Sequence, residues 1–185
     1  MAVIFHSRIF KHFLLIGIFA LFLSVFNANA QSVLVGGAVV YGDDVEQLGV
    51  HLRGYYNLRN ERICFGPEYS HFFTANFSKD GGQATKKLKE YNFNIHYVFE
   101  LNETLGFYPL TGLNYSTEIE EQETLVGWRS FKEDALGVNL GFGFHKVVGR
   151  SVLFVEFDHL FSELSQNSAL IGLFYNLSKK NEHGE

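Results

Sequence analysis

The chain has 185 residues, of which 15 are Lys or Arg, 20 are Asp or Glu and one is Cys. If residues 1–30 are an export signal, the remaining 155 residues form one domain with 13 basic and 20 acidic residues, a net charge of −7. This acidic balance excludes nucleic-acid binding as the main role, and a single Cys excludes an internal disulfide. Cys64 is therefore expected to be an inert thiol, buried or facing an interior.

The first thirty residues have the order of an export signal. Arg8 and Lys11 precede an apolar stretch of thirteen residues from Phe13 to Val25, and the segment ends in small residues at Ala30. A membrane-spanning helix needs about twenty apolar residues, so this stretch is too short to remain as an anchor. We expect cleavage after Ala30, and no Cys follows it that could carry a lipid.

From residue 32 onward, segments of about ten residues alternate apolar and polar side chains. The clearest alternation runs from Tyr91 to Glu100. A period of two places apolar side chains on one face of a strand and small or polar ones on the other. The pattern predicts strands at residues 32–41, 47–56, 63–70, 91–100, 105–115, 136–144, 153–158 and 169–177. We therefore predict an all-β fold, an eight-stranded antiparallel up-and-down transmembrane β-barrel with lipid outside and a polar lumen.

The predicted connections alternate between short and long. Short turns are expected at 57–61, 101–103 and 146–150, and long irregular polar loops at 74–87 and 117–133, with shorter connections of the same set at 42–46 and 162–167. Both termini then share the short-turn side, which would be periplasmic. Pro67 and Pro109 should lie at a bulge or bend, because proline removes a ladder donor.

Several strand sequences resemble those of the small Gram-negative outer-membrane β-barrel proteins, the opacity and OmpX-like group, and especially the porin-family barrels of the Bacteroidetes. The resemblance covers residues 32–178 and is clearest at Tyr91–Tyr97, Tyr108–Asn114, Leu136–Gly143 and Ala169–Tyr175. It implies a domain at 31–178 and outer-membrane localisation, with outer-membrane lipid, lipopolysaccharide and the barrel-assembly machinery as partners. It implies no chemistry. One departure is the charged tail at 179–185, since such barrels commonly end on an aromatic residue.

The inward-facing side chains include charged and polar groups, namely Arg53, Glu68, Glu156, His51, His96 and Asn139. Eight strands enclose a lumen that side chains can fill, and an unpaired buried charge costs several kcal/mol. We expect these residues to form a network of ion pairs and hydrogen bonds that plugs the lumen. A small-solute porin and a gated proton or ion path are the alternatives.

A lipid A-modifying enzyme of the deacylase kind is a further alternative. Glu156, His159 and Ser162 offer the residue types of a hydrolase triad. Residues three apart on a regular strand point to opposite faces, so this spacing disfavours a triad. We expect no catalytic residue, no cofactor and no metal, because the acidic loop lacks the spacing of a calcium site.

The two predicted long loops carry the candidates for surface interaction, namely Lys79, Lys86, Trp128 and Arg129. Lysines near the outer rim could meet lipopolysaccharide phosphates, and an exposed Trp could anchor a partner. The sequence identifies no extracellular ligand. A soluble lipocalin-like barrel is disfavoured, because its pocket would be lined by the polar face and its apolar face would lie in water. A structural envelope role, surface interaction and lipid modification thus remain the candidate functions.

Overall fold

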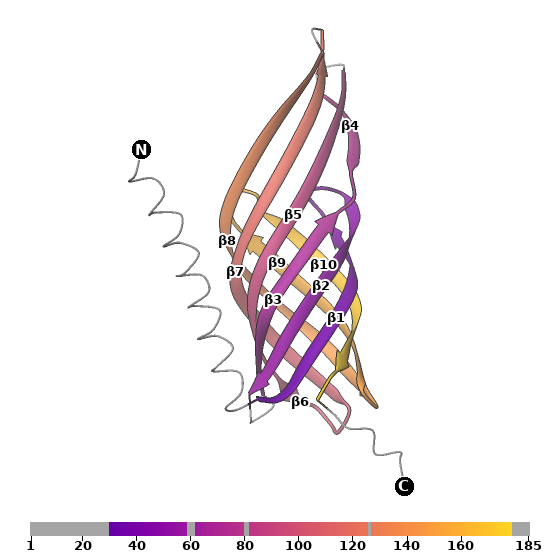
Figure 1. The fold of residues 1–185 in the computed structure, drawn as a ribbon, viewed down its shortest axis with the longest axis vertical. Helices are drawn as coiled ribbons and strands as arrows, with labels where there is room; N and C mark the ends of the chain where they lie inside the picture. Colours follow the sequence, from indigo (N-terminus) through magenta and orange to yellow (C-terminus); the bar gives the residue numbers. More distant parts are fainter. Residues whose placement is uncertain (1–29, 59–61, 80–81, 126, 179–185) are drawn as a thin grey trace, which may run out of the picture.

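The computed structural model describes residues 30–58, 62–79, 82–125 and 127–178 as a chain of β-strands (Figure 1). The expected signal before Ala30, part of the 57–61 turn and the charged tail lie outside these described residues. The strands are β1 (Ala30–Gly42), β2 (Gln47–Leu58), β3 (Ile63–Phe72), β4 (Ala75–Lys79), β5 (Gly82–Tyr97), β6 (Phe99–Glu100), β7 (Leu105–Thr124), β8 (Gly127–Val148), β9 (Ser151–Phe161) and β10 (Gln166–Asn176).

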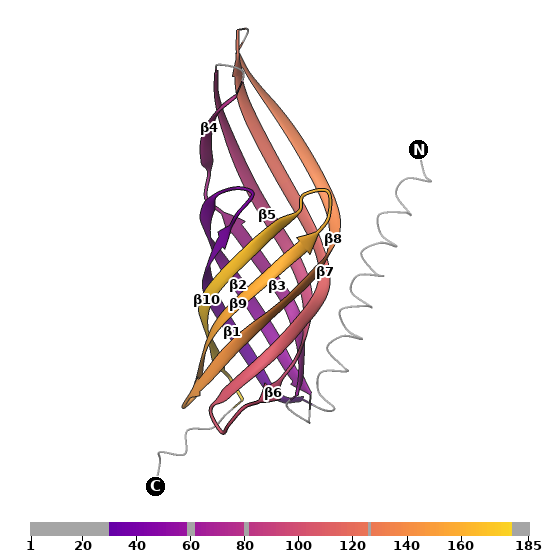
Figure 2. The same cartoon turned by 180° about the vertical axis from the view of Figure 1, so that it is seen from behind.

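Eight strands close into a barrel, which confirms the predicted fold. Each long strand pairs antiparallel with the next long strand along the chain, and pairing of β1 with β10 and of β5 with β7 completes the ring. The short strands β4 and β6 continue the lines of β3 and β5 after an interruption, and they pair with β5 and β7 respectively. Figure 2 shows the other side of the barrel, where β8, β9 and β10 lie in front. No helix in the described part of the chain is long and apolar enough to cross a membrane.

Side chains alternate between the two faces of the barrel wall, as the period of two predicts. The outer face is apolar: Leu136 is 79% exposed, and its neighbours two and four residues along β8, Val138 and Leu140, are 43% and 48% exposed. Between them on the same strand, Asn139 is 4% exposed. The same alternation holds on β9, where Val155 is exposed and Glu156 is fully buried. The barrel therefore has an apolar outer face, and its polar side chains point inward.

Most of the residues predicted as two long irregular loops form strands instead, so this part of the prediction is wrong. Residues 74–87 are mostly β4 and the first part of β5, and residues 117–133 continue β7 and β8 to a tight turn. Pairing of β7 with β8 runs as far as Thr124 and Gly127, and β5 pairs with β7 as far as Ala84 and Gln122. Figure 1 shows these strands rising well beyond the turns that join β1 to β2 and β9 to β10. Both faces of this projecting part carry mainly polar residues with a few exposed apolar ones, so the sequence there has no regular apolar alternation.

Both prolines lie beside a gap in a ladder. The pairing of β2 with β3 is interrupted between Glu68 and Phe65, where Pro67 stands, and the register is the same on both sides of the gap. Pro109 lies between the pairings of β7 with β5 and with β6. Each proline thus sits at a local break in pairing, where its missing N–H leaves no ladder acceptor unpaired.

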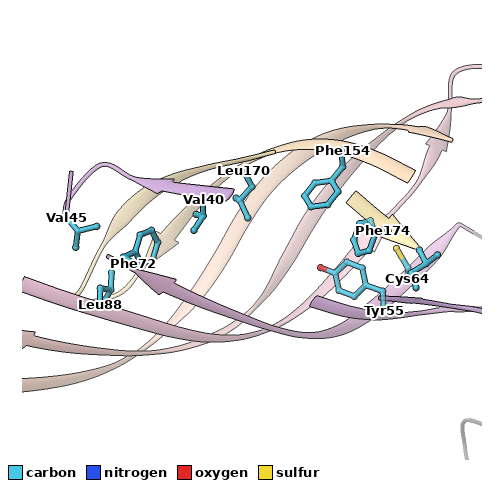
Figure 3. Packing of buried hydrophobic residues seen from close by; sticks show 10 residues of the cluster. Val40, Val45, Tyr55, Cys64, Phe72, Leu88, Phe154, Leu170 and Phe174 are labelled. Atoms are coloured by element: carbon cyan, nitrogen blue, oxygen red, sulfur yellow. The ribbon is translucent and has the colours of Figure 1, made fainter. Parts of the chain in front are cut away.

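The interior contains one cluster of buried apolar side chains, in which two groups can be distinguished (Figure 3). The first group lies toward the projecting end and comprises Val40, Val45, Phe72, Leu88 and Leu170; the second comprises Tyr55, Cys64, Phe154 and Phe174, with Leu34 paired to Tyr55 on the adjacent strand. Cys64 is buried and free, in keeping with the inert thiol expected from the sequence. The guanidinium carbon of Arg53 lies 4.6 Å from the Phe154 ring centroid, so the second group packs against charged residues.

Candidate functional site

A charged pair crosses the lumen between strands that are not neighbours. Arg53 on β2 donates from Nη1 to Oε2 of Glu156 at 2.8 Å and from Nη2 to Oε1 at 2.7 Å. Both side chains have 0% exposure. Such a bidentate geometry is the strongest form of an Arg–carboxylate contact. The pair therefore holds β2 and β9 together across the interior.

A second carboxylate, Glu68 on β3, completes the cluster. Its oxygens accept hydrogen bonds from the Tyr55 hydroxyl and, at 2.9 Å, from Nδ2 of Asn94. Nη2 of Arg53 lies 3.5 Å from Oε1 of Glu68. Glu156 receives one more bond, from the Tyr108 hydroxyl at 2.9 Å. Each buried carboxylate thus has several donors, which offsets the cost of removing its charge from water.

The two predicted lumen histidines have different partners. Nε2 of His51 accepts a hydrogen bond from Nε of Arg53 at 2.8 Å, while Nδ1 lies 2.9 Å from the Ser70 hydroxyl. Because Nε2 is an acceptor, His51 is neutral and carries its proton on Nδ1. Nε2 of His96 lies 2.6 Å from the Tyr55 hydroxyl, and its ring stacks on Tyr108 at a centroid distance of 4.6 Å.

Asn139 extends the network to β8. Its Nδ2 donates to Oδ1 of Asn92 at 3.0 Å and to Oδ1 of Asn94 at 3.1 Å. Through Asn94 it is linked to Glu68. The structure therefore brings all six predicted lumen residues into one connected group. Tyr55, which the sequence analysis missed, is central to it, and its position two residues after Arg53 on the same strand face was the available signal.

The candidate triad is not assembled. Glu156 is engaged by Arg53 inside the barrel, whereas Nδ1 of His159 bonds Oδ1 of Asn167 at 2.8 Å and its ring packs on Phe161. Ser162 follows the end of β9. Among the residues that the structure describes, no group of three or more His, Cys, Asp or Glu side chains is arranged to hold a metal ion.

The part of the wall that projects beyond the other turns consists of β4, the first part of β5, the last part of β7 and the first part of β8, and is called the projecting sheet below. It carries the four predicted surface residues. Nζ of Lys79 lies 2.6 Å from Oε1 of Glu120, and Nζ of Lys86 lies 3.1 Å from Oδ2 of Asp44 and 3.3 Å from Oε2 of Glu118. Partial burial of Lys86 acts to lower its pKa, but the bonds and charges of Asp44 and Glu118 outweigh this effect and raise the pKa. These two lysines therefore serve as ion-pair partners within the sheet.

Trp128 and Arg129 lie on opposite faces of the projecting sheet. Both are exposed, but successive residues of β8 point to opposite sides, and Trp128 shares its side with Leu136 and Val138. Trp128 is paired with Glu123 and Arg129 with Gln122 on β7. From the sequence, Trp128 and Arg129 were grouped as one interaction candidate, but the structure places them on opposite faces. A partner that lies against one face of the sheet therefore cannot contact both.

The same part of β8 has a free backbone edge. β8 pairs with β7 along its whole length but with β9 only from Val138 onward. No described strand pairs with the other edge of residues 127–137. At the opposite side of the projecting sheet, β4 covers β5 from Ala75 to Lys79. Among the described strands, the sheet β4–β5–β7–β8 therefore ends in two edge strands, the short β4 and the longer unpaired stretch of β8.

The fold places the chain in the class of closed eight-stranded antiparallel barrels, and solved outer-membrane barrels are similar to it. The attachment invasion locus protein Ail of Yersinia pestis matches with 15% identity over 80% of this chain and 99% of its own, with a TM-score of 0.57. The N-terminal barrel domain of Pseudomonas aeruginosa OprF matches with 13% identity over 80% and 99%, with a TM-score of 0.56. A major outer membrane protein from Thermus thermophilus matches with 10% identity over 79% and 98%, with a TM-score of 0.64. Comparison of the sequence with family models and with curated proteins found no match.

Proposed function

We propose that this chain is a non-enzymatic outer-membrane barrel that acts at the cell surface through its projecting sheet. The observation that carries the proposal is the free edge of β8 at residues 127–137. An exposed strand edge offers unpaired N–H and C=O groups, and an extended segment of a partner can add to it as a further strand. Exposed Trp128 and Phe131, 58% and 53% accessible, would then contact that segment from the two faces of β8.

Outer-membrane placement is supported by the barrel's surface. The apolar outer face is too large to leave in water, and aromatic rings form rows near both of its ends, as in the girdles of membrane barrels, with further rings such as Phe93 and Phe142 between them. Tyr69, Tyr91 and Tyr115 form one cross-strand row, with centroid distances of 5.1 Å and 6.4 Å. Near the short-turn end, Phe107 packs on Phe99 and Phe144. The projecting sheet then lies beyond the first row, outside the bilayer.

The lumen is proposed to be closed to solutes. Arg53 and Glu156 cross it, Tyr55 and Tyr108 bond the carboxylates, and Phe72 and Leu88 are fully or nearly fully buried toward the projecting end. An eight-stranded barrel has room for little beyond its own side chains. This packing weighs against the small-solute porin alternative.

Binding of polyanions through the lysines is less well supported. One of the similar Ail structures contains the heparin analogue sucrose octasulfate. In this chain, however, Lys79, Lys86 and Lys132 each pair with a carboxylate at 2.6 to 3.1 Å, so their charge is already partly neutralised. Lipopolysaccharide phosphate contact would require these pairs to exchange.

Selection of displayed random ten-residue peptides against the barrel in nanodiscs tests the edge proposal. The deletion control replaces Thr117–Asp134 by Asn-Gly, which keeps the pairing of Ser116 with Ala135 intact and removes all but the last three residues of the free edge. Selected peptides should bind the intact barrel but not the trimmed one, and methylation of alternate peptide amides should abolish binding. Failure to enrich any peptide, or equal binding to the trimmed barrel, would refute the edge as the interaction surface.

A further inference from the structure

A cavity of about 440 Å³ lies inside the barrel at the end where the short turns meet. Its depth is lined by side chains of the polar cluster, including Tyr55, His96 and Tyr108, and its mouth by turn residues such as Glu103 and Arg150. The volume falls within the range of small-molecule sites. The Arg53–Glu156 cluster lies directly behind Tyr55 and Tyr108, so the cavity is a cup with a packed floor.

Apolar and aromatic side chains share the wall and floor of the cup with polar ones such as Asn57, His96 and His145. Leu34, Val98, Leu105, Val147, Val152 and Phe174 contribute aliphatic and aromatic surface. Tyr108 cannot turn into the space, because its ring stacks on His96 at 4.6 Å and on His145 at 5.9 Å. Its hydroxyl is committed to Glu156. The deep part of the cup thus suits a compact apolar body.

Acceptors dominate the polar groups around the mouth. Glu100 and Glu103 are exposed carboxylates that line the cavity, and Oδ1 of Asn57, also on the lining, accepts no hydrogen bond from the described residues. The one Lys or Arg side chain on the described lining is Arg150, and its guanidinium donates to the main-chain oxygen of Asn176 at 3.0 and 3.3 Å. A ligand that brings donors and positive charge complements this mouth.

We propose that this cup binds small amphipathic amines, with the apolar body against Val98, Val152 and Phe174 and the ammonium group at Glu100 and Glu103. A protonated primary amine has three donors and no acceptor, which matches the two carboxylates and the unpartnered Asn57 oxygen. The inference does not depend on the projecting sheet, which lies at the opposite end of the barrel (Figure 1).

Calorimetric titration of the barrel in zwitterionic nanodiscs, with empty nanodiscs as the blank, tests the ligand class. The probes are 2-phenylethylamine, 2-phenylethanol and 3-phenylpropanoate, which share a phenyl ring and differ in the charge of the head group. The amine should bind most tightly and the carboxylate most weakly. Equal affinity for the alcohol and the amine would overturn the proposal.

Matched charge variants locate the head group. The double variant Glu100→Gln and Glu103→Gln should bind the amine about tenfold more weakly, since two exposed ion pairs are removed. The control Glu123→Gln and Glu133→Gln removes the same charge from the projecting sheet and should leave the affinity unchanged. An equal loss in both variants, or no loss in the first, would overturn the site.

Nuclear Overhauser contacts from the bound phenyl ring locate the apolar body. Contacts to methyl groups of Val98 and Val152 are expected. Contacts to Val40 or Leu88, which lie toward the other end, would place the ligand elsewhere and contradict the proposal (Figure 3). This measurement uses the unchanged chain, so it does not depend on how well any variant folds.

Discussion

The side chain of Asp43, in the turn between β1 and β2, accepts two hydrogen bonds from Asn167, which follows the turn between β9 and β10. The main-chain N–H of Asn167 bonds Oδ1 at 2.7 Å, and its Nδ2 bonds Oδ2 at 2.6 Å. The N–H of Asp43 in turn donates to the main-chain oxygen of Asn167 at 3.0 Å. These contacts tie together two turns that adjoin across the β1–β10 seam.

The Asp43–Asn167 contact should weaken in acid. The side-chain bond from Asn167 is the largest cause that holds the pKa of Asp43 below its usual 3.8. For a carboxyl with a lowered folded pKa, the stabilisation is present above the unfolded pKa and is lost as pH falls through the folded value. Amide exchange of residues 43–46 and 166–168 should therefore accelerate below pH 3.8, beyond its intrinsic pH dependence. Asp43→Asn should remove this acceleration and Glu163→Gln should not; an unchanged profile in Asp43→Asn would contradict the assignment.

Removal of one partner of the lumen cluster should be severely destabilising. Arg53→Met leaves Glu156 and Glu68 buried without their cation, and loss of one partner of a buried pair costs about 3–5 kcal/mol. Urea unfolding of the barrel from lipid vesicles measures the change. Lys132→Met is the matched control, because Lys132 and Asp134 pair at the surface. A similar stability of the two variants would show that the buried cluster contributes nothing specific.

Lipid contact predicts a difference between two positions on one face of β8. Phe142 is 44% exposed on the apolar part of the outer face, whereas Ser130 has the same orientation on the projecting part. Phe142→Arg should cost about 2–4 kcal/mol in a bilayer, as arginine does near the midplane of membrane barrels, and Ser130→Arg close to nothing. Folding yield and urea midpoint in vesicles provide the measurement. Equal values for both would argue against a bilayer around Phe142.

Conduction separates a closed barrel from a porin. With Arg53, Glu68 and Glu156 bonded across the lumen, no water column wide enough for sugars is expected to form. Purified protein in planar bilayers should show no stable large conductance, although brief small events from the cup at one end are compatible with the packing. Reproducible nanosiemens channels from the intact chain would instead support the transport alternative.

Much of the barrel could be predicted from the sequence. A wall with an apolar outer face and a polar inner face requires apolar and polar residues to alternate along each strand. Asn139 and Val138 illustrate this, since their opposite environments follow from adjacent positions alone. The projecting sheet was missed, because polar residues such as Glu120 and Lys132 occupy both of its faces, and a polar sequence without alternation resembles that of a loop. Pairing across the lumen, as of Arg53 with Glu156, depends on strand tilt and shear, which periodicity does not reveal.

The Arg53–Glu156 pair joins residues 103 positions apart, on β2 and β9. An open sheet holds these strands far from each other, so until β1 meets β10 Glu156 lacks its cation and Arg53 can reach only Glu68 on the adjacent strand β3. Such partly assembled sheets are penalised, whereas the sealed ring gains its ion pair and its last ladder together. The cluster thus makes closure of the barrel nearly all-or-none, because the last strand pairing and the buried ion pair form in the same step. Few half-closed forms are then expected to persist in the membrane.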